Sequence, residues 1–173
     1  MDIQNKELHR IDSTAIIYRG RGDDFEYLIT KRSLAKKAFP GKWTVPGGGL
    51  ETDDYVNTPP TTSAGLWYFA IENSLKREIK EEVNLETDKI RYLLDMTFIR
   101  PDGVPAIVLS FYAHYVSGEV TLDEDSIEYA WATAEECRKY DLIDGILEEI
   151  EMVDKVLKGA NEDEVIKNSP LRR

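Results

Sequence analysis

Three glutamates stand at spacings that suit the binding of a divalent cation. Glu78, Glu81 and Glu82 lie at positions i, i+3 and i+4, so on a helix their side chains fall within a sector of about 100°. Carboxylates clustered without histidine or cysteine favour Mg²⁺ or Mn²⁺, which offset their mutual repulsion and leave room for substrate phosphates. The pattern predicts metal-assisted phosphoryl chemistry, and a solvated, charged helix face is the alternative interpretation.

A helix and a glycine-rich loop are expected to position these carboxylates. Apolar residues recur every fourth position within residues 67–83 and predict an amphipathic helix there. Upstream, three consecutive glycines follow Pro46 and allow the backbone to approach a ligand closely. Between the two, residues 52–66 contain two prolines and no apolar period. They are therefore expected to form an irregular insertion.

The rest of the chain reads as short strands and a second helix. Strands are expected at residues 13–18, 25–30, 42–45, 90–99, 106–116 and 129–132. Turn residues between the first two strands, and between the fourth and fifth, predict two antiparallel hairpins. Thr133 and Glu136 match a capping box. A last helix is expected at residues 144–157, and residues 161–173 are expected to form a polar, frayed tail.

Length and charge restrict the class of protein. The chain has 173 residues, with 22 Lys and Arg against 33 Asp and Glu, a net charge of −11. Residues 1–160 are expected to form one domain. Because no apolar run approaches the roughly 20 residues of a membrane span and no secretory signal is evident, a cytoplasmic protein with no membrane partner is expected. The acid excess argues against nucleic acid as the main partner.

The order of these motifs resembles the Nudix hydrolase superfamily, whose pattern is G-x5-E-x7-R-E-U-x-E-E-x-G-U, where U is a bulky aliphatic residue. Gly48 matches the first glycine, Arg77 and Glu78 match the R-E pair, and Glu81 and Glu82 match the E-E pair. The resemblance extends from about residue 13 to residue 157. It implies an α/β fold, a Nudix-type α/β/α sandwich with a mixed β-sheet.

The sequence departs from the family pattern at three points. Asp54 replaces a glutamate, which keeps the carboxylate but shortens its reach. Residues 55–76 supply 22 positions where the pattern has 7. Asn84 replaces the late glycine, and Asn is the next best tolerated residue in a left-handed conformation. The set formed by one arginine and three glutamates remains intact.

The resemblance implies a Mg²⁺-dependent pyrophosphohydrolase, with Mn²⁺ as a possible substitute, in which water attacks phosphorus. Its substrate would be a nucleoside diphosphate linked to another group, as in a nucleotide, a nucleotide sugar or a dinucleotide. The metal ligands would be Glu78, Glu82 and Glu81, and the catalytic residues Glu81, Arg77 and Glu78. Glu81 would complete the metal site or assist the attacking water. Further candidates for the general base, each with a solvated loop position as the alternative, are Glu124, Asp125 and Glu128.

Substrate contacts are assigned to three residues. Arg32 would contact phosphate, Trp43 would stack on a base, and Gly48 would allow close approach. An exposed arginine and a core tryptophan are the respective alternatives. The insertion at 52–66 is expected to form a flap beside the metal edge that tunes substrate choice. A homodimer is possible because relatives commonly dimerise.

A second class of function is a Nudix-like module that binds a nucleotide without turnover, motivated by Asp54, Asn84 and the insertion. An isomerase branch of the same scaffold uses a cysteine early in the chain. The single cysteine here, Cys137, lies late, which argues against that branch.

Overall fold

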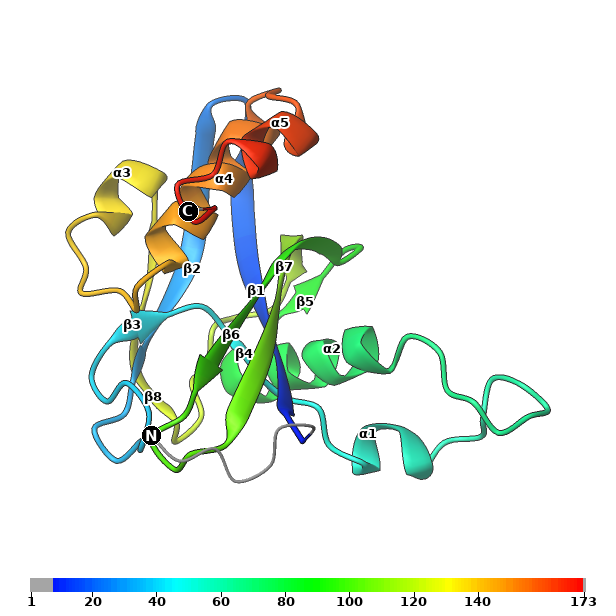
Figure 1. Cartoon of the computed structure of the whole chain (residues 1–173). Helices are drawn as coiled ribbons and strands as arrows, with labels where there is room; N and C mark the ends of the chain where they lie inside the picture. Colours follow the sequence, from blue (N-terminus) through cyan, green and yellow to red (C-terminus); the bar gives the residue numbers. More distant parts are fainter. Residues whose placement is uncertain (1–7, 173) are drawn as a thin grey trace.

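A mixed β-sheet lies between two helices in the computed structural model, which describes residues 8–172 (Figure 1). The strands are β1 (Arg10–Arg21), β2 (Asp24–Arg32), β3 (Trp43–Thr44), β4 (Gly47–Gly49), β5 (Glu86–Thr87), β6 (Arg91–Ile99), β7 (Pro105–Ser117) and β8 (Ser126–Ala132). The helices are α1 (Asp53–Val56), α2 (Ala70–Val83), α3 (Ala134–Cys137), α4 (Ile146–Leu157) and α5 (Glu162–Lys167).

β1 organises the sheet. It pairs antiparallel with β2 and with β4, and parallel with β7. The path β3-β2-β1-β7-β5 is completed by β6 on β7 and by β8 on β2. The antiparallel pairs β1–β2 and β6–β7 confirm both predicted hairpins. The mixed sheet with a helix on each face confirms the predicted α/β class.

Alternating residues of β1 build two core layers. Ile17 faces α2 and packs with Leu75 and Ile79. Ile16 faces the opposite side and packs in a cluster that includes Ile150 of α4. Each such side chain is almost fully buried, which contributes roughly 1.5–3 kcal/mol. The buried apolar side chains of α2 therefore hold this helix against β1, the strand that pairs with β4.

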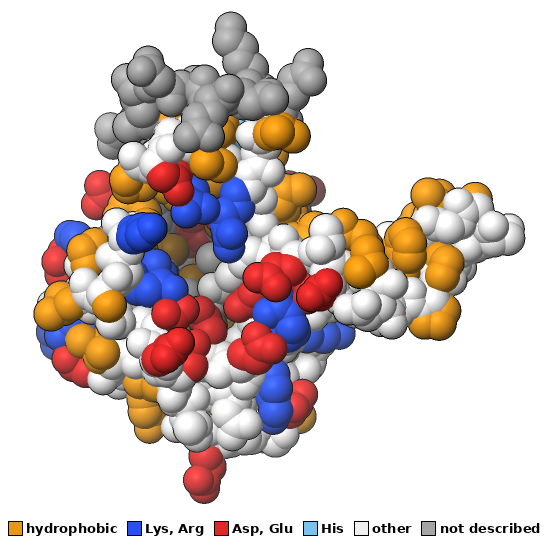
Figure 2. All heavy atoms as spheres, turned by 90° about the horizontal axis from the view of Figure 1, so that it is seen from below, with side chains coloured by type: hydrophobic (Ala, Val, Ile, Leu, Met, Phe, Trp, Pro, Cys, Tyr) orange, Lys and Arg blue, Asp and Glu red, His pale blue; other side chains and the backbone are white. Residues whose placement is uncertain are grey.

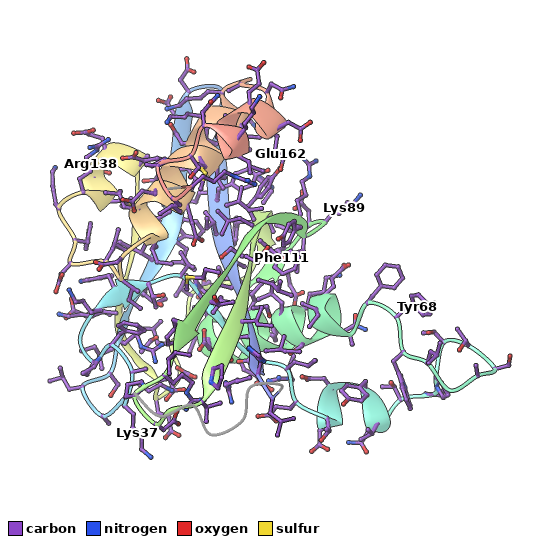
Figure 3. The ribbon with its side chains drawn as sticks, viewed as in Figure 1. Lys37, Tyr68, Lys89, Phe111, Arg138 and Glu162 are labelled. Atoms are coloured by element: carbon purple, nitrogen blue, oxygen red, sulfur yellow. The ribbon has the colours of Figure 1, made fainter. Side chains whose placement is uncertain are left out.

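The insertion is larger and more ordered than its sequence suggests. It contains the short helix α1, and α2 begins at Ala70 rather than at residue 67. Hydrogen bonds within the insertion keep the residues before Ala70 out of the helix. Thr61 N donates to Leu66 O at 2.9 Å, and Trp67 Nε1 donates to Thr58 O at 2.9 Å. Figure 1 shows the segment projecting away from the sheet, and Tyr68, which Figure 3 labels, lies between it and α2.

Three other segments differ from expectation. The glycine run forms β4 on β1 instead of a free loop. β8 begins at Ser126 because its pairing with β2 extends to Arg32. The tail is not frayed at α5, since Asn161 accepts a hydrogen bond from Glu164 N at 3.0 Å and caps that helix. The predicted capping box at Thr133 is confirmed.

In the part of the chain that the structure describes, no helix combines the length and the apolar character that crossing a membrane requires.

Candidate functional site

β4 positions two of the predicted carboxylates on α2. A Cβ added at Gly48 would lie 2.3 Å from Glu78 Cδ, so the Glu78 carboxylate occupies space that only a glycine leaves open. Gly47 N donates a hydrogen bond to Glu82 Oε2 at 2.8 Å. The glycine run thus brings the backbone of β4 against both glutamate side chains of α2.

Burial changes the acidity of this pair. The pKa of Glu82 is raised to about 7, chiefly by burial and also by the charges of Glu78 and Asp123, while the Gly47 N–H opposes the rise. Burial also raises the pKa of Glu78, which the neighbouring Arg77 guanidinium opposes. Carboxylates with raised pKa values that face each other mark functional sites. A bound cation would favour their ionised forms.

An acidic loop completes the cluster. One carboxylate oxygen from each of Glu82, Asp123 and Asp125 lies within 4.8 Å of the others. The loop is tied to the end of α2, since Asp123 N donates to Glu82 O at 3.3 Å, and Asp125 N donates to Asp123 Oδ1 at 2.9 Å. These hard oxygen donors fit Mg²⁺ or Mn²⁺. Asp123 was missed by sequence reasoning because acidic composition alone does not say which loop residue turns inward.

Arg77 links the insertion to α2. Its Nε and Nη2 donate to the two oxygens of Asp54 at 2.5 and 3.1 Å, and its Nη1 donates to Glu81 Oε2 at 2.8 Å. The same Nη1 lies 3.0 Å from Glu78 Oε1. Only 4% of the Asp54 side chain is exposed, and the hydrogen bond from Arg77 lowers its pKa to about 2. The shorter aspartate therefore reaches its partner.

The other candidate acids differ in whether they belong to this cluster. Glu81 turns toward Arg77, and 58% of its side chain is exposed. Asp125 lies in the cluster and also pairs with a lysine. Glu128 pairs with a lysine at 2.7 Å, and Glu124 is exposed. Asp125 is thus the loop candidate for a general base that shares the cluster with Glu82.

The predicted substrate residues have distinct environments. Arg32 Nε donates to Ala38 O at 3.0 Å, and the charge of Arg32 helps to lower the pKa of Glu82, so this arginine lies beside the acidic cluster. Trp43 is buried in the core, with its ring 4.7 Å from that of Tyr140, which supports the core alternative for this residue. Figure 2 shows a hollow on this face, bordered by acidic side chains on one side and by Lys and Arg side chains on the other.

Comparisons with known proteins show what the chain is similar to. The family model described as NUDIX domain matches residues 8–150. Nucleoside triphosphatase NudI of Klebsiella pneumoniae (strain 342) is 30% identical over 127 residues, which cover 67% of this chain and 79% of that protein.

Solved structures share the fold. The MutT protein from Methanosarcina mazei Go1 has 23% sequence identity and a TM-score of 0.64, and the match covers 90% of this chain and 99% of that one. The NUDIX domain of Shewanella oneidensis NrtR, complexed with ADP ribose, has 15% identity and a TM-score of 0.67 over 91% of this chain and 94% of that one.

Proposed function

This chain belongs to the NUDIX domain family, and on that premise we propose that it is a Mg²⁺- or Mn²⁺-dependent pyrophosphohydrolase of nucleoside diphosphate derivatives. Water attacks phosphorus and gives its proton to a general base, and one phosphoanhydride bond breaks. The products are a nucleoside monophosphate and the rest of the substrate, which leaves as pyrophosphate from a nucleoside triphosphate or as a phosphate ester from a nucleoside diphosphate linked to another group. The observation that carries this proposal is the group of half-buried carboxylates of Glu82, Asp123 and Asp125 beside Glu78. The name of the NudI relative supports a nucleoside triphosphate as substrate.

The acidic cluster would hold the cation. Glu82, Asp123 and Asp125 offer oxygens at mutual distances that one ion can bridge, and Glu78 lies alongside. When bound, the metal neutralises charge on the phosphates and lowers the pKa of the attacking water. Because burial raises the pKa of Glu82, loading of the metal is coupled to loss of a proton from this side chain.

The residues around the cluster have separate roles in this scheme. Arg77 orients Glu78 and Glu81 through hydrogen bonds and an ion pair. Arg32, fixed by its hydrogen bond to a backbone carbonyl, contacts a substrate phosphate with its remaining N–H groups. The general base that receives the proton of the attacking water is Glu81 or Asp125. Separate Glu81→Gln and Asp125→Asn variants distinguish the two by their loss of kcat at saturating Mg²⁺, because Asp125 is also a proposed metal ligand.

A second candidate is a binding module without turnover. The NrtR NUDIX domain was solved with ADP ribose bound, and the three departures from the family pattern motivated this reading. Two of them are accommodated, since Asp54 keeps its contacts with Arg77 and Asn84 adopts the left-handed conformation with φ of 54°. The intact site therefore favours hydrolysis.

The test is a substrate screen with purified protein. Nucleoside triphosphates, ADP ribose, nucleotide sugars and dinucleoside polyphosphates are incubated with Mg²⁺, with Mn²⁺ or with EDTA, and the products are separated by anion-exchange chromatography. The proposal predicts a nucleoside monophosphate from at least one class, released only with metal. Tight binding of these compounds without product would instead support the sensor.

A further inference from the structure

A lysine touches the acidic cluster and has no role in the reaction described above. The Nζ atom of Lys36 donates to Oδ2 of Asp125, and Asp125 is one of the three carboxylates that form the cluster. Both side chains are partly exposed. A positive charge of the protein therefore lies against a carboxylate that is also a proposed ligand of the divalent cation.

Holding two loops together does not explain this ion pair. Ser33 N already donates to Asp125 O at 2.8 Å, and β2 pairs with β8 as far as Arg32. An ion pair between partly exposed groups adds little stability, because solvent screens it. The position of Lys36 is therefore better explained by chemistry at the cluster.

The segment that carries Lys36 has the charge that phosphate groups attract. Residues 31–42 contain five Lys and Arg and no Asp or Glu, in a chain whose net charge is −11. Burial raises the pKa of Glu82, and the charge of Arg32 opposes this rise, so Arg32 also lies beside the cluster. Figure 2 shows Lys and Arg side chains across the hollow from the acidic ones. The segment is therefore suited to hold phosphates whose cation lies at the cluster.

A cation at the cluster would change the electrostatic surroundings of Lys36. Mg²⁺ on Asp125 repels an ammonium group that contacts the same carboxylate. Phosphate oxygens that bind this cation bring negative charge close to the ammonium group. A lysine is a compact charge on a flexible stem, so it can move from the carboxylate to the phosphate. Cation binding and the ion pair between Lys36 and Asp125 therefore weaken each other.

We propose that Lys36 is a phosphate-binding residue that Asp125 holds until a divalent cation binds, and that Lys36 then moves to a phosphate of the substrate. This inference rests on the proposed function, since it assumes a cation at the cluster and phosphates on that cation. It predicts two opposite effects of removing the lysine. The cation binds more tightly to the protein alone, and the nucleotide binds more weakly to the protein that carries the cation. A merely structural ion pair predicts no gain in cation affinity.

The test measures binding without turnover in the wild type, in Lys36→Met and in Lys37→Met. Lys37 is the matched control, because it is exposed and points into solvent from the same loop (Figure 3). Electron paramagnetic resonance gives the Mn²⁺ affinity of each protein alone. Calorimetry at saturating Mn²⁺ gives the affinity for α,β-methylene nucleoside triphosphates, whose methylene bridge resists hydrolysis.

Lys36→Met should bind Mn²⁺ about 3- to 10-fold more tightly than the wild type and the nucleotide analogue about 10-fold more weakly. Lys37→Met should stay within about 2-fold of the wild type in both measurements. Lys36→Arg keeps the positive charge and should bind Mn²⁺ with nearly the wild-type affinity. Thermal unfolding midpoints of Lys36→Met and Lys37→Met should agree, because neither side chain is part of the core.

Unchanged or weaker Mn²⁺ binding in Lys36→Met would overturn the inference, and so would an unchanged affinity for the analogue. Failure of the wild type to bind Mn²⁺ would instead refute the proposed function. Metal-dependent hydrolysis by the wild type, together with wild-type affinities in Lys36→Met, would refute only this inference.

Discussion

Arg77 is the residue on which the geometry of the candidate site depends most. Its guanidinium donates to both oxygens of Asp54 and to one oxygen of Glu81, and it lies next to Glu78. A fork of N–H donors facing a carboxylate fixes direction as well as distance. Asp54 therefore acts on the site through Arg77, although it lies within the insertion.

Replacing Asp54 by asparagine should lower the free energy of unfolding at pH 7. The folded-state pKa of Asp54, about 2, is below its ordinary value of 3.8, so its stabilisation is present above about pH 4 and is lost as the pH falls toward 2. We expect a loss of about 1–2 kcal/mol, because solvent screens the partly exposed guanidinium.

Urea unfolding of the wild type and of Asp54→Asn at pH 7 and pH 2.5 checks this expectation. The difference between the two proteins should shrink at the lower pH. Asp53→Asn, an exposed neighbour on α1, serves as the control and should show no such difference. An equal gap at both pH values would contradict the assigned role of the ion pair.

At this scale the sequence predicted the residues that a helix holds together. The proximity of Glu78 and Glu82 was predicted because one turn of α2 aligns them, a relation that spacing encodes. Asp123 was not found, because its approach to Glu82 depends on how a loop packs against the end of α2. Glu81 was expected among the metal ligands, yet its side chain turns toward Arg77. Side-chain direction within a charged cluster is set by the competing partners around it.

At the scale of elements, the contact between β4 and α2 sets the position of two proposed metal ligands, Glu78 and Glu82. Gly48 lies on β4, and its missing side chain leaves the space that the Glu78 carboxylate fills. We expect Gly48→Ala to displace this carboxylate and to weaken Mn²⁺ binding by about 10-fold or more, since shifted ligands lose geometry. Titration followed by electron paramagnetic resonance measures the affinity.

A double-mutant cycle provides the control for Gly48. In a Glu78→Ala background the added methyl group has no carboxylate to displace, so Gly48→Ala should cost little further affinity. If the alanine weakens binding equally in both backgrounds, the contact between β4 and α2 does not act through Glu78.

The insertion is a second element with a separable effect. Deleting residues 55–63 leaves Asp54 and Arg77 in place, so the metal affinity should stay near the wild-type value. We expect the ratio of kcat/KM between two substrates to change, because the insertion joins α2 to Asp54, which contacts Arg77 at the candidate site. The measurement compares both quantities in one preparation. A substrate ratio identical to that of the wild type would show that the insertion does not tune substrate choice.

The spacing of apolar residues predicted the elements that form the core. It failed at helix ends that local hydrogen bonds determine. The elements that pack in the two core layers have apolar residues at the regular spacing of a strand or a helix, and these elements are β1, β2, β6, β7, α2 and α4. The start of α2 was misplaced because Trp67 donates within the insertion instead of continuing the helix. α5 was missed because its polar residues gave no apolar stripe, and its cap at Asn161 is a single side chain.

On the scale of the whole molecule, the net charge of −11 is unevenly distributed. Figure 2 shows acidic side chains gathered beside the hollow, with basic side chains across from them. Without a cation the half-buried carboxylates repel one another, which costs stability. A ligand that binds only the folded state stabilises it by about 2.7 kcal/mol at a concentration of 100 times its Kd. Mg²⁺ should therefore stabilise the folded protein through the same half-buried carboxylates on which the proposed hydrolysis depends.

The most direct test compares the wild type with Glu82→Gln and with Glu72→Gln, a control on α2 that pairs with Lys76 at 2.7 Å. Hydrolysis of the best substrate and the shift of the unfolding midpoint are both measured with Mg²⁺ and with EDTA. We predict that Glu82→Gln loses at least about 100-fold in kcat/KM, equivalent to about 2.7 kcal/mol, together with the Mg²⁺-dependent stabilisation. Glu72→Gln should keep both. Full activity in Glu82→Gln, or wild-type activity in EDTA, would contradict a metal-dependent reaction at this centre.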